Sequence, residues 1–227
     1  MNRQKRYVGN EKYFSSSSAG NCLRKIYFKV NKEDITDPIK PQNKRIMRLG
    51  TAVHTELEKA FDLFIESGQN EKYGIESIRM EEEVVYEELN VRGFYDLLIE
   101  TKDGKFILVD FKTIGSFPWK LKVVGDKDNT FHEMQLGTYG LCIEKQYGKV
   151  DQMVLAYYNK DNSEMRGLKV SLSNMDIAYE FWKKAGEKTK FGANLPPLVV
   201  GESPSQSWEC GYCEYKQLCI KKDIESK

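Results

Sequence analysis

The 227-residue chain has no long apolar run: none approaches the roughly 18 residues that a membrane-spanning helix requires. Its N-terminal stretch, MNRQKRYVGNEKYF, also lacks the apolar core of a secretory signal. These two absences argue against a membrane protein and against a secreted one. We therefore expect no membrane partner and a cytoplasmic location.

The chain also lacks an excess of either charge, since 35 lysines and arginines face 34 acidic residues, for a net charge of +1. A nucleic-acid-binding protein with this balance must gather its cations locally, because phosphate contacts need a basic surface. Three clusters could form one: residues 24–32, 40–48 and 119–127. Each could equally be a solvated surface, so composition neither supports nor excludes DNA binding.

Cysteines are few and odd in number, with five in all. Without a signal sequence, an odd count argues against a disulfide framework. Cys210, Cys213 and Cys219 nevertheless fall within ten residues near the C-terminus, and this clustering predicts a metal or cluster site. Cys142 has no such neighbours, and we interpret it as a small core residue.

What the chain does contain is enough apolar material, 40% of residues, for the core of one large domain over residues 1–227. Helical spacing of apolar residues predicts four helices, at about 15–30, 46–66, 132–148 and 173–190. Strand patterns occur at 81–89, in two runs within 93–115, and at 152–159 and 166–172. A Pro-rich loop over 195–206 leads to the cysteine cluster. This order indicates an α/β or α+β sheet with helices packed on it.

Two apolar runs within 93–115 carry acids where strand interiors are expected, and the TKDGK sequence between them predicts a hairpin. A two-residue turn would place Asp96 and Asp110 on opposite faces. A three-residue loop over 102–104, with Gly104 at the position that needs positive φ, would place them opposite each other with Lys112 on the same face. Facing carboxylates repel unless a cation lies between them. The pattern predicts a Mg²⁺ or Mn²⁺ site, with ordinary ion pairs as the alternative.

The Asp of GFYD at 93–96, followed by Asp-Phe-Lys at 110–112, resembles the PD-(D/E)XK nuclease superfamily. LGTAVH, ending at His54, and QLGTY, with Gln135 and Tyr139, resemble motifs of its RecB-like branch. Tyr95 stands where that motif usually has Pro. The spacing of Cys22 and CGYCEYKQLC is similar to the four-cysteine [4Fe-4S] site of CRISPR-adaptation exonucleases and AddB-type nucleases. The resemblance runs from about residue 15 to residue 219.

This resemblance implies a restriction-endonuclease-like core, in which helices flank a central mixed sheet and a cysteine-rich C-terminal tail is pinned to the N-terminal helix. It implies these metal ligands: His54, Asp96, Asp110 and the backbone carbonyl of Phe111. Lys112 would orient the attacking water as an ammonium, the form in which a free lysine exists at neutral pH. Gln135 and Tyr139 would position Lys112, the water or a phosphate. His132 belongs to no motif, and we expect it at the surface or in a loop.

Two further implications concern the cysteines and the substrate. Residues 15–30 and 205–220 would together hold the [4Fe-4S] cluster through Cys22, Cys210, Cys213 and Cys219, with Zn²⁺ as the alternative occupant. The activity implied is metal-dependent hydrolysis of DNA phosphodiester bonds, by an exonuclease acting on single-stranded ends. The alternatives are a DNA-binding or processing subunit of a recombination or CRISPR-adaptation-like complex with little activity alone, and a structure-specific endonuclease.

Overall fold

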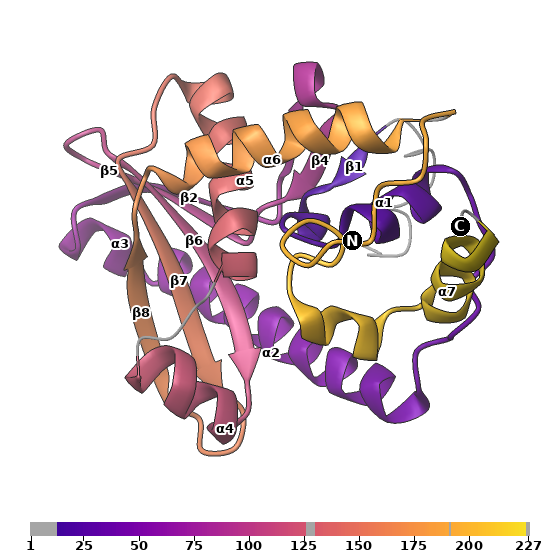
Figure 1. Cartoon of the computed structure of the whole chain (residues 1–227). Coiled ribbons are helices and arrows are strands. Elements are labelled where there is room, and N and C mark those ends of the chain that lie inside the picture. The colour runs from indigo at the N-terminus through magenta and orange to yellow at the C-terminus, as the bar shows by residue number, and fades with distance from the viewer. Residues whose placement is uncertain (1–12, 126–129, 191, 226–227) are drawn as a thin grey trace.

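A five-stranded mixed sheet forms the centre of the protein in the computed structural model, which describes residues 13–125, 130–190 and 192–225. Its strands, in spatial order, are β2 (Ile75–Met80), β5 (Leu97–Thr101), β6 (Phe106–Ile114), β7 (Gln152–Asn159) and β8 (Met165–Val170). The β6–β7 pair is parallel and the other pairs are antiparallel. Helices lie on both faces of the sheet, as the sequence predicted (Figure 1).

Alternation along the strands supplies both faces with apolar side chains. Leu98 and Leu108 point to α5 (Thr130–Tyr147), where they share one core with Leu136 and Ile143; α6 (Asn174–Thr189) packs on α5 in turn. The opposite face packs against Leu57 and Phe61 of α2 (Pro41–Glu66) through Leu97, Val109 and Phe111. A buried leucine contributes roughly 1.5–3 kcal/mol, so these two layers fix both helices on the sheet.

A second, three-stranded sheet has the order β1 (Phe14–Ser15), β4 (Val91–Phe94), β3 (Glu83–Tyr86). Strand β2 leads into β3 and β4 leads into β5, so the two sheets are joined by one antiparallel strand pair, a ribbon that bends between them. Met80 and Leu97 are the last pair in the large sheet, and Glu83 and Phe94 are the first pair in the small one. Asp96 therefore lies at the bend and not in a strand interior, which corrects the prediction of one continuous strand. The predicted strand at 81–89 is likewise shorter, since η3 (Glu87–Leu89) follows β3.

The predicted three-residue hairpin loop is confirmed. The backbone N–H of Thr101 donates to Lys105 O at 3.0 Å, and Gly104 takes a φ of +73°. Glycine adopts this left-handed conformation at no steric cost. Because Leu97 pairs with Val109 in the same register, Asp96 and Asp110 are the next residues opposite each other.

The remaining elements lie around these two sheets. The serine run forms a short 3₁₀ helix and not the expected start of a longer helix, which begins only at Leu23 after the left-handed Gly20. These elements are η2 (Ser16–Ser18), α1 (Leu23–Val30), α3 (Gln69–Lys72), α4 (Ser116–Trp119), η4 (Lys120–Val124), η5 (Ser207–Tyr212) and α7 (Lys216–Glu225). No helix within the described ranges combines the length and apolar character needed to cross a bilayer.

Candidate active site

Three carboxylates form a row where the adjacent strands β2, β5 and β6 of the large sheet stop pairing. Glu81 follows β2, Asp96 precedes β5, and Asp110 lies opposite Asp96 on β6. The Glu81 N–H donates to the Asp96 carbonyl at 3.2 Å, and the Phe111 N–H donates to Asp96 Oδ2 at 2.7 Å. Glu81 has a φ of +53°, which non-glycine residues seldom adopt and which is common at functional sites.

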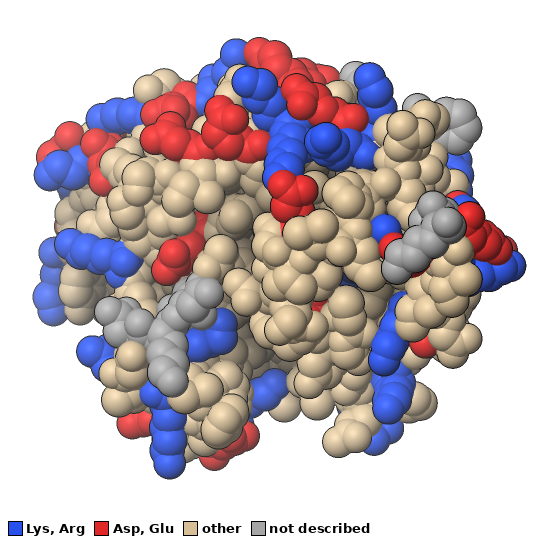
Figure 2. Space-filling view, in the orientation of Figure 1, with Lys and Arg blue, Asp and Glu red and all other residues tan. Residues whose placement is uncertain are grey.

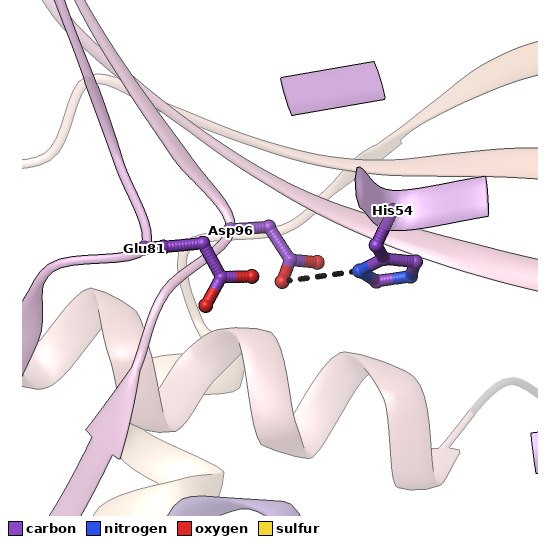
Figure 3. A group of neighbouring side chains, drawn as sticks. All are labelled: His54, Glu81 and Asp96. Carbon is purple, nitrogen blue, oxygen red and sulfur yellow. Dashed lines mark ion pairs between the residues drawn. The ribbon is translucent and has the colours of Figure 1, made fainter. Parts of the chain in front are cut away.

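Helix α2 adds an imidazole to this row. His54 Nδ1 lies 3.5 Å from Asp96 Oδ1, and one ligand atom from each of His54, Glu81 and Asp96 falls within 4.8 Å of the others (Figure 3). Carboxylate oxygens suit Mg²⁺ and Mn²⁺, and an imidazole is a common additional ligand for transition metals. The donor set therefore fits a divalent cation.

The sequence analysis missed Glu81. It belongs to the run Glu81–Glu83, and nothing in the run itself distinguishes one carboxylate from its neighbours. The signal that separates them is the register of β2, which places Glu81 opposite Asp96. Strand β2 was not predicted, so the register could not be used.

The charges at this edge are unevenly distributed. Burial pushes the pKa of Asp96 up, but His54, Lys112 and the Phe111 N–H together outweigh it, so the pKa lies below its usual value. Burial also lowers the pKa of His54, and the contact with Asp96 outweighs that effect and leaves it raised. The pKa of Asp110 is raised, because it is fully buried and Asp96 repels its negative charge. Asp96 is therefore a stronger acid than Asp110.

Asp110 and Lys112 begin a chain of polar contacts that reaches α5. Lys112 Nζ lies 2.6 Å from Asp110 Oδ2 and donates to Gln135 Oε1 at 2.8 Å. Gln135 Nε2 donates to Tyr139 Oη, one helical turn further on, at 3.1 Å. The structure thus gathers all the predicted site residues. Asp110, however, pairs with Lys112 and lies outside the tight group of His54, Glu81 and Asp96.

A cleft of about 900 Å³ opens over this site. His54, Glu81, Asp96, Gln135 and Tyr139 line it, whereas Asp110 and Lys112 lie behind its surface. Its remaining lining includes apolar side chains from α2 and the small sheet and two lysines: Ile46, Met47, Phe14, Phe94, Lys29 and Lys160. The cleft therefore combines an acidic floor with apolar walls and outlying cations.

Gly93, the first residue of the GFYD motif, is required by packing at this cleft. A Cβ at position 93 would overlap the Ser16 side chain and lie 2.8 Å from a ring carbon of Tyr139. Non-bonded carbon atoms prefer separations of about 3.5–4.0 Å. Only glycine lets Ser16 and Tyr139 approach β4 this closely.

The prediction for His132 is wrong. It lies on α5, half-buried, with Nδ1 2.8 Å from Tyr157 Oη. Burial, together with the nearby cations Lys112 and Lys122, lowers its pKa to about 3. His132 is therefore a neutral imidazole beside the site, which its lack of a motif did not reveal.

The four predicted cluster cysteines line a second cavity, of about 170 Å³. Cys22 is the residue before α1, while Cys210, Cys213 and Cys219 come from the C-terminal segment. Burial raises the pKa of Cys22 to about 11. Cys142 is buried in the main core, as predicted.

Buried Arg24 of α1 holds the C-terminal segment in place. Its guanidinium donates to Pro196 O at 2.6 Å, to Asp223 Oδ1 at 2.9 Å and to Cys219 Sγ at 3.4 Å. The Cys22 N–H also donates to Glu209 Oε2 at 2.9 Å. The predicted pinning of the cysteine-rich tail to the N-terminal helix is therefore confirmed by direct contacts.

A sequence profile of the PD-(D/E)XK nuclease superfamily matches residues 64–220, well over half of the chain. The chain therefore belongs to the PD-(D/E)XK nuclease superfamily. No curated protein matches it in sequence.

Solved structures share the fold. SSO0001 superposes with a TM-score of 0.50 at 19% identity over 95% of this chain and 89% of its own. A candidate exonuclease from Eubacterium rectale has a TM-score of 0.50 at 14% identity, with coverages of 81% and 83%. The alkaline exonuclease LHK-Exo from Laribacter hongkongensis is less similar, with a TM-score of 0.45 at 11% identity and coverages of 80% and 90%.

Proposed function

We propose that this superfamily member is a divalent-metal-dependent DNA nuclease that acts as an exonuclease on single-stranded ends. The observation that carries the proposal is the group of His54, Glu81 and Asp96 at the floor of a cleft, with Asp110 behind it and Lys112 paired to Asp110. Phosphodiester hydrolysis needs a cation that polarises the phosphate and a positive group that stabilises the developing charge. The acids would hold the cation, and Lys112 would supply the positive group.

His54, Glu81 and Asp96 would hold Mg²⁺ or Mn²⁺, and Asp110 would join them once Lys112 releases it. The Phe111 carbonyl is a further candidate. Its N–H is directed at Asp96, and the N–H and C=O of one residue face the same side of an antiparallel pair. When bound, the cation would polarise the scissile phosphate and neutralise developing negative charge.

Lys112 would orient the attacking water and stabilise negative charge as an ammonium. Gln135 accepts a hydrogen bond from Lys112 Nζ and donates one to Tyr139. Gln135 therefore fixes the direction of the ammonium, and Tyr139 fixes the amide of Gln135. Burial raises the pKa of Tyr139, so its phenol stays neutral and takes no proton from the water.

The cleft supports a single-stranded DNA substrate. Its volume of about 900 Å³ is at the upper end of that for small-molecule sites, which is room for a few nucleotides of one strand. Phe14, Phe94 and Met47 offer apolar contact to exposed bases, and Lys29 and Lys160 offer charge to phosphates.

The test is cleavage, with Mn²⁺ and Mg²⁺, of end-labelled linear single strands, linear duplexes and circular single strands. We expect mononucleotides or short products from linear single strands and no cutting of circles. Lys112→Ala and Asp110→Asn should lower the rate at least 100-fold, whereas Lys105→Ala on the exposed hairpin should not. Full activity of the Lys112 variant would refute the mechanism, and cut circles would favour the endonuclease alternative. DNA binding without cleavage by the isolated chain would favour a subunit of a DNA-processing complex.

We also propose that the four cysteines hold a [4Fe-4S] cluster with a structural role. The proposal rests on the spacing of Cys22 and CGYCEYKQLC in the sequence and on the single cavity of about 170 Å³ that the four cysteines line. Thiolates are soft ligands that suit an iron–sulfur cluster, and Zn²⁺ is the alternative occupant. Anaerobically purified protein should be brown, with iron and sulfide in equal amounts. Cys210→Ser should lose the iron and Cys142→Ser should keep it. A colourless protein with one zinc ion per chain would refute the cluster.

A further inference from the structure

The outer side of the cysteine segment exposes two large aromatic rings. Trp208 and Tyr212, on η5, are 56% and 74% exposed, whereas the other tryptophans, Trp119 and Trp182, are 7% and 0% exposed. The rings of Trp208 and Tyr212 meet edge to face with centroids 6.2 Å apart. Trp208 also contacts the ring of Phe131 on α5, with centroids 5.4 Å apart. Neighbouring exposed aromatic rings commonly mark an interaction surface.

These rings lie close to the candidate active site. Phe131 precedes Gln135 by four residues on α5, so the two share one face of the helix. Gln135 lines the catalytic cleft and Phe131 supports Trp208, so one helical turn separates the cleft from the rings. In Figure 1 the gold segment that contains η5 is drawn between the end of α5 and α2.

The charge beside the rings favours an anionic partner. Lys25 and Lys216 belong to the lining of the cysteine cavity, as Trp208 and Tyr212 do, and Lys216 is exposed. Neither lysine forms an ion pair with a carboxylate of the described residues. The carboxylate of Glu209 is buried and accepts hydrogen bonds from the Cys22 and Gln206 backbone N–H groups. Figure 2 shows a broad area of uncharged residues at the centre of this face, with charged residues of both signs around its margins.

We infer that Trp208 and Tyr212 form a nucleobase-stacking site for the single strand whose end lies in the catalytic cleft. Proteins that hold single strands combine aromatic rings, on which bases stack, with cations along the backbone. Protein–protein interfaces instead tend to exclude lysine from their centre. The presence of two lysines beside the rings therefore favours single-stranded DNA over a protein partner. The path of the strand rests on the proposed nuclease function, whereas the stacking itself does not.

Trp208 supplies its own probe, because it is the exposed member of the three tryptophans. The full-length Lys112→Ala protein, which should leave DNA intact, would be titrated with a dT12 oligonucleotide and with an abasic 12-mer of the same charge. We expect dT12 to quench Trp208 emission and to shield it from acrylamide. The abasic strand should do neither, and in Trp208→Phe the dT12-dependent quenching should disappear.

Affinity measurements on matched variants separate stacking from simple exposure. Trp208→Ala and Tyr212→Ala should each weaken dT12 binding roughly tenfold, the order of one lost base–aromatic stack. Tyr212→Phe should bind as the parent does, because it keeps the ring. Tyr73→Ala, which removes an exposed ring remote from the cleft, should also leave binding unchanged. Thermal melts would verify that each variant is folded.

Two results would overturn the inference. One is equal affinity for dT12 and the abasic strand with Trp208 equally accessible in both complexes. The other is shielding of Trp208 that depends on protein concentration without DNA, which would assign the rings to a contact between copies of the chain. Cleavage by the wild-type protein is scored separately. Shielding without cleavage would refute the nuclease and keep the stacking site, and cleavage without shielding would do the reverse.

Discussion

Glu81 and Asp96 face each other one position beyond Met80 and Leu97, the last pair of the large sheet, where the strand pair bends toward the small sheet. The Glu81 N–H donates to the Asp96 carbonyl at 3.2 Å, and both carboxylates come within ligand distance of His54. The bend places both carboxylates within reach of His54 on α2, although Leu97, the residue next to Asp96, packs under the same helix.

Glu81→Gln should weaken Mn²⁺ binding at least tenfold, because an amide oxygen carries no negative charge to offset that of the cation. Free Mn²⁺ can be counted by electron paramagnetic resonance during a titration. Glu83→Gln is the control from the same segment, since Glu83 pairs with Arg92 on the small sheet and should not matter. Equal affinities for the two variants would remove Glu81 from the site.

Gln135→Leu should lower kcat about tenfold or more and leave the KM for DNA nearly unchanged. The reason is the loss of one hydrogen bond to a charged group, worth about 1.5–3 kcal/mol, which fixes the Lys112 ammonium. Steady-state kinetics on an end-labelled single strand would measure both constants. Gln146→Leu, exposed on the same helix, is the control and should behave as the parent. A changed KM with unchanged kcat would make Gln135 a binding residue instead.

Gly93→Ala should destabilise the fold by about 1–3 kcal/mol, because its Cβ would overlap Ser16 and crowd Tyr139. Urea unfolding would measure this, and adding Ser16→Gly should recover part of the loss. Gly186→Ala should instead stabilise the fold by up to about 1 kcal/mol. Gly186 lies within α6, and no atom is near the position that its Cβ would take. A Gly93→Ala protein as stable as its parent would contradict the packing.

Acid should destabilise the protein in part through His132. Its folded pKa of about 3 lies below the unfolded value near 6.5, so the unfolded chain binds the proton more tightly. The stability that it contributes is therefore fully present above pH 6.5 and is lost as the pH falls toward 3. Between pH 6.5 and 5 this loss amounts to about 2 kcal/mol.

The substitution His132→Gln, which leaves a side chain neutral at every pH, should reduce this acid sensitivity. Urea unfolding in EDTA at pH 7.5 and pH 5 would compare the variant with the parent. The other acids of the site titrate in both proteins, so the difference between them isolates His132. Identical losses on acidification would show that His132 protonates without penalty in the folded state.

Local patterns predicted much of the fold. The hairpin loop was predictable because Gly104 follows Asp103 between two apolar runs, and that loop sets the register of Asp96 and Asp110. The long helices were predictable from their apolar spacing, although α2 begins earlier, at Pro41, than the predicted residue 46. Strand β2 was missed because its sequence, IESIRM, alternates poorly and its neighbour in the sheet is distant in sequence.

The sequence by itself identified most residues of the proposed sites: the acids and the lysine of the hairpin, the histidine of α2, the Gln–Tyr pair of α5 and the cysteines at the two ends of the chain. These follow from local spacing and from motif, which a single chain carries without its partners. Only the tertiary structure decided that Glu81 joins His54 and Asp96, that Asp110 is held by Lys112, and that His132 is buried and neutral. The physical reason is that such contacts depend on the bend of the ribbon and on packing between distant elements, and neither leaves a local pattern.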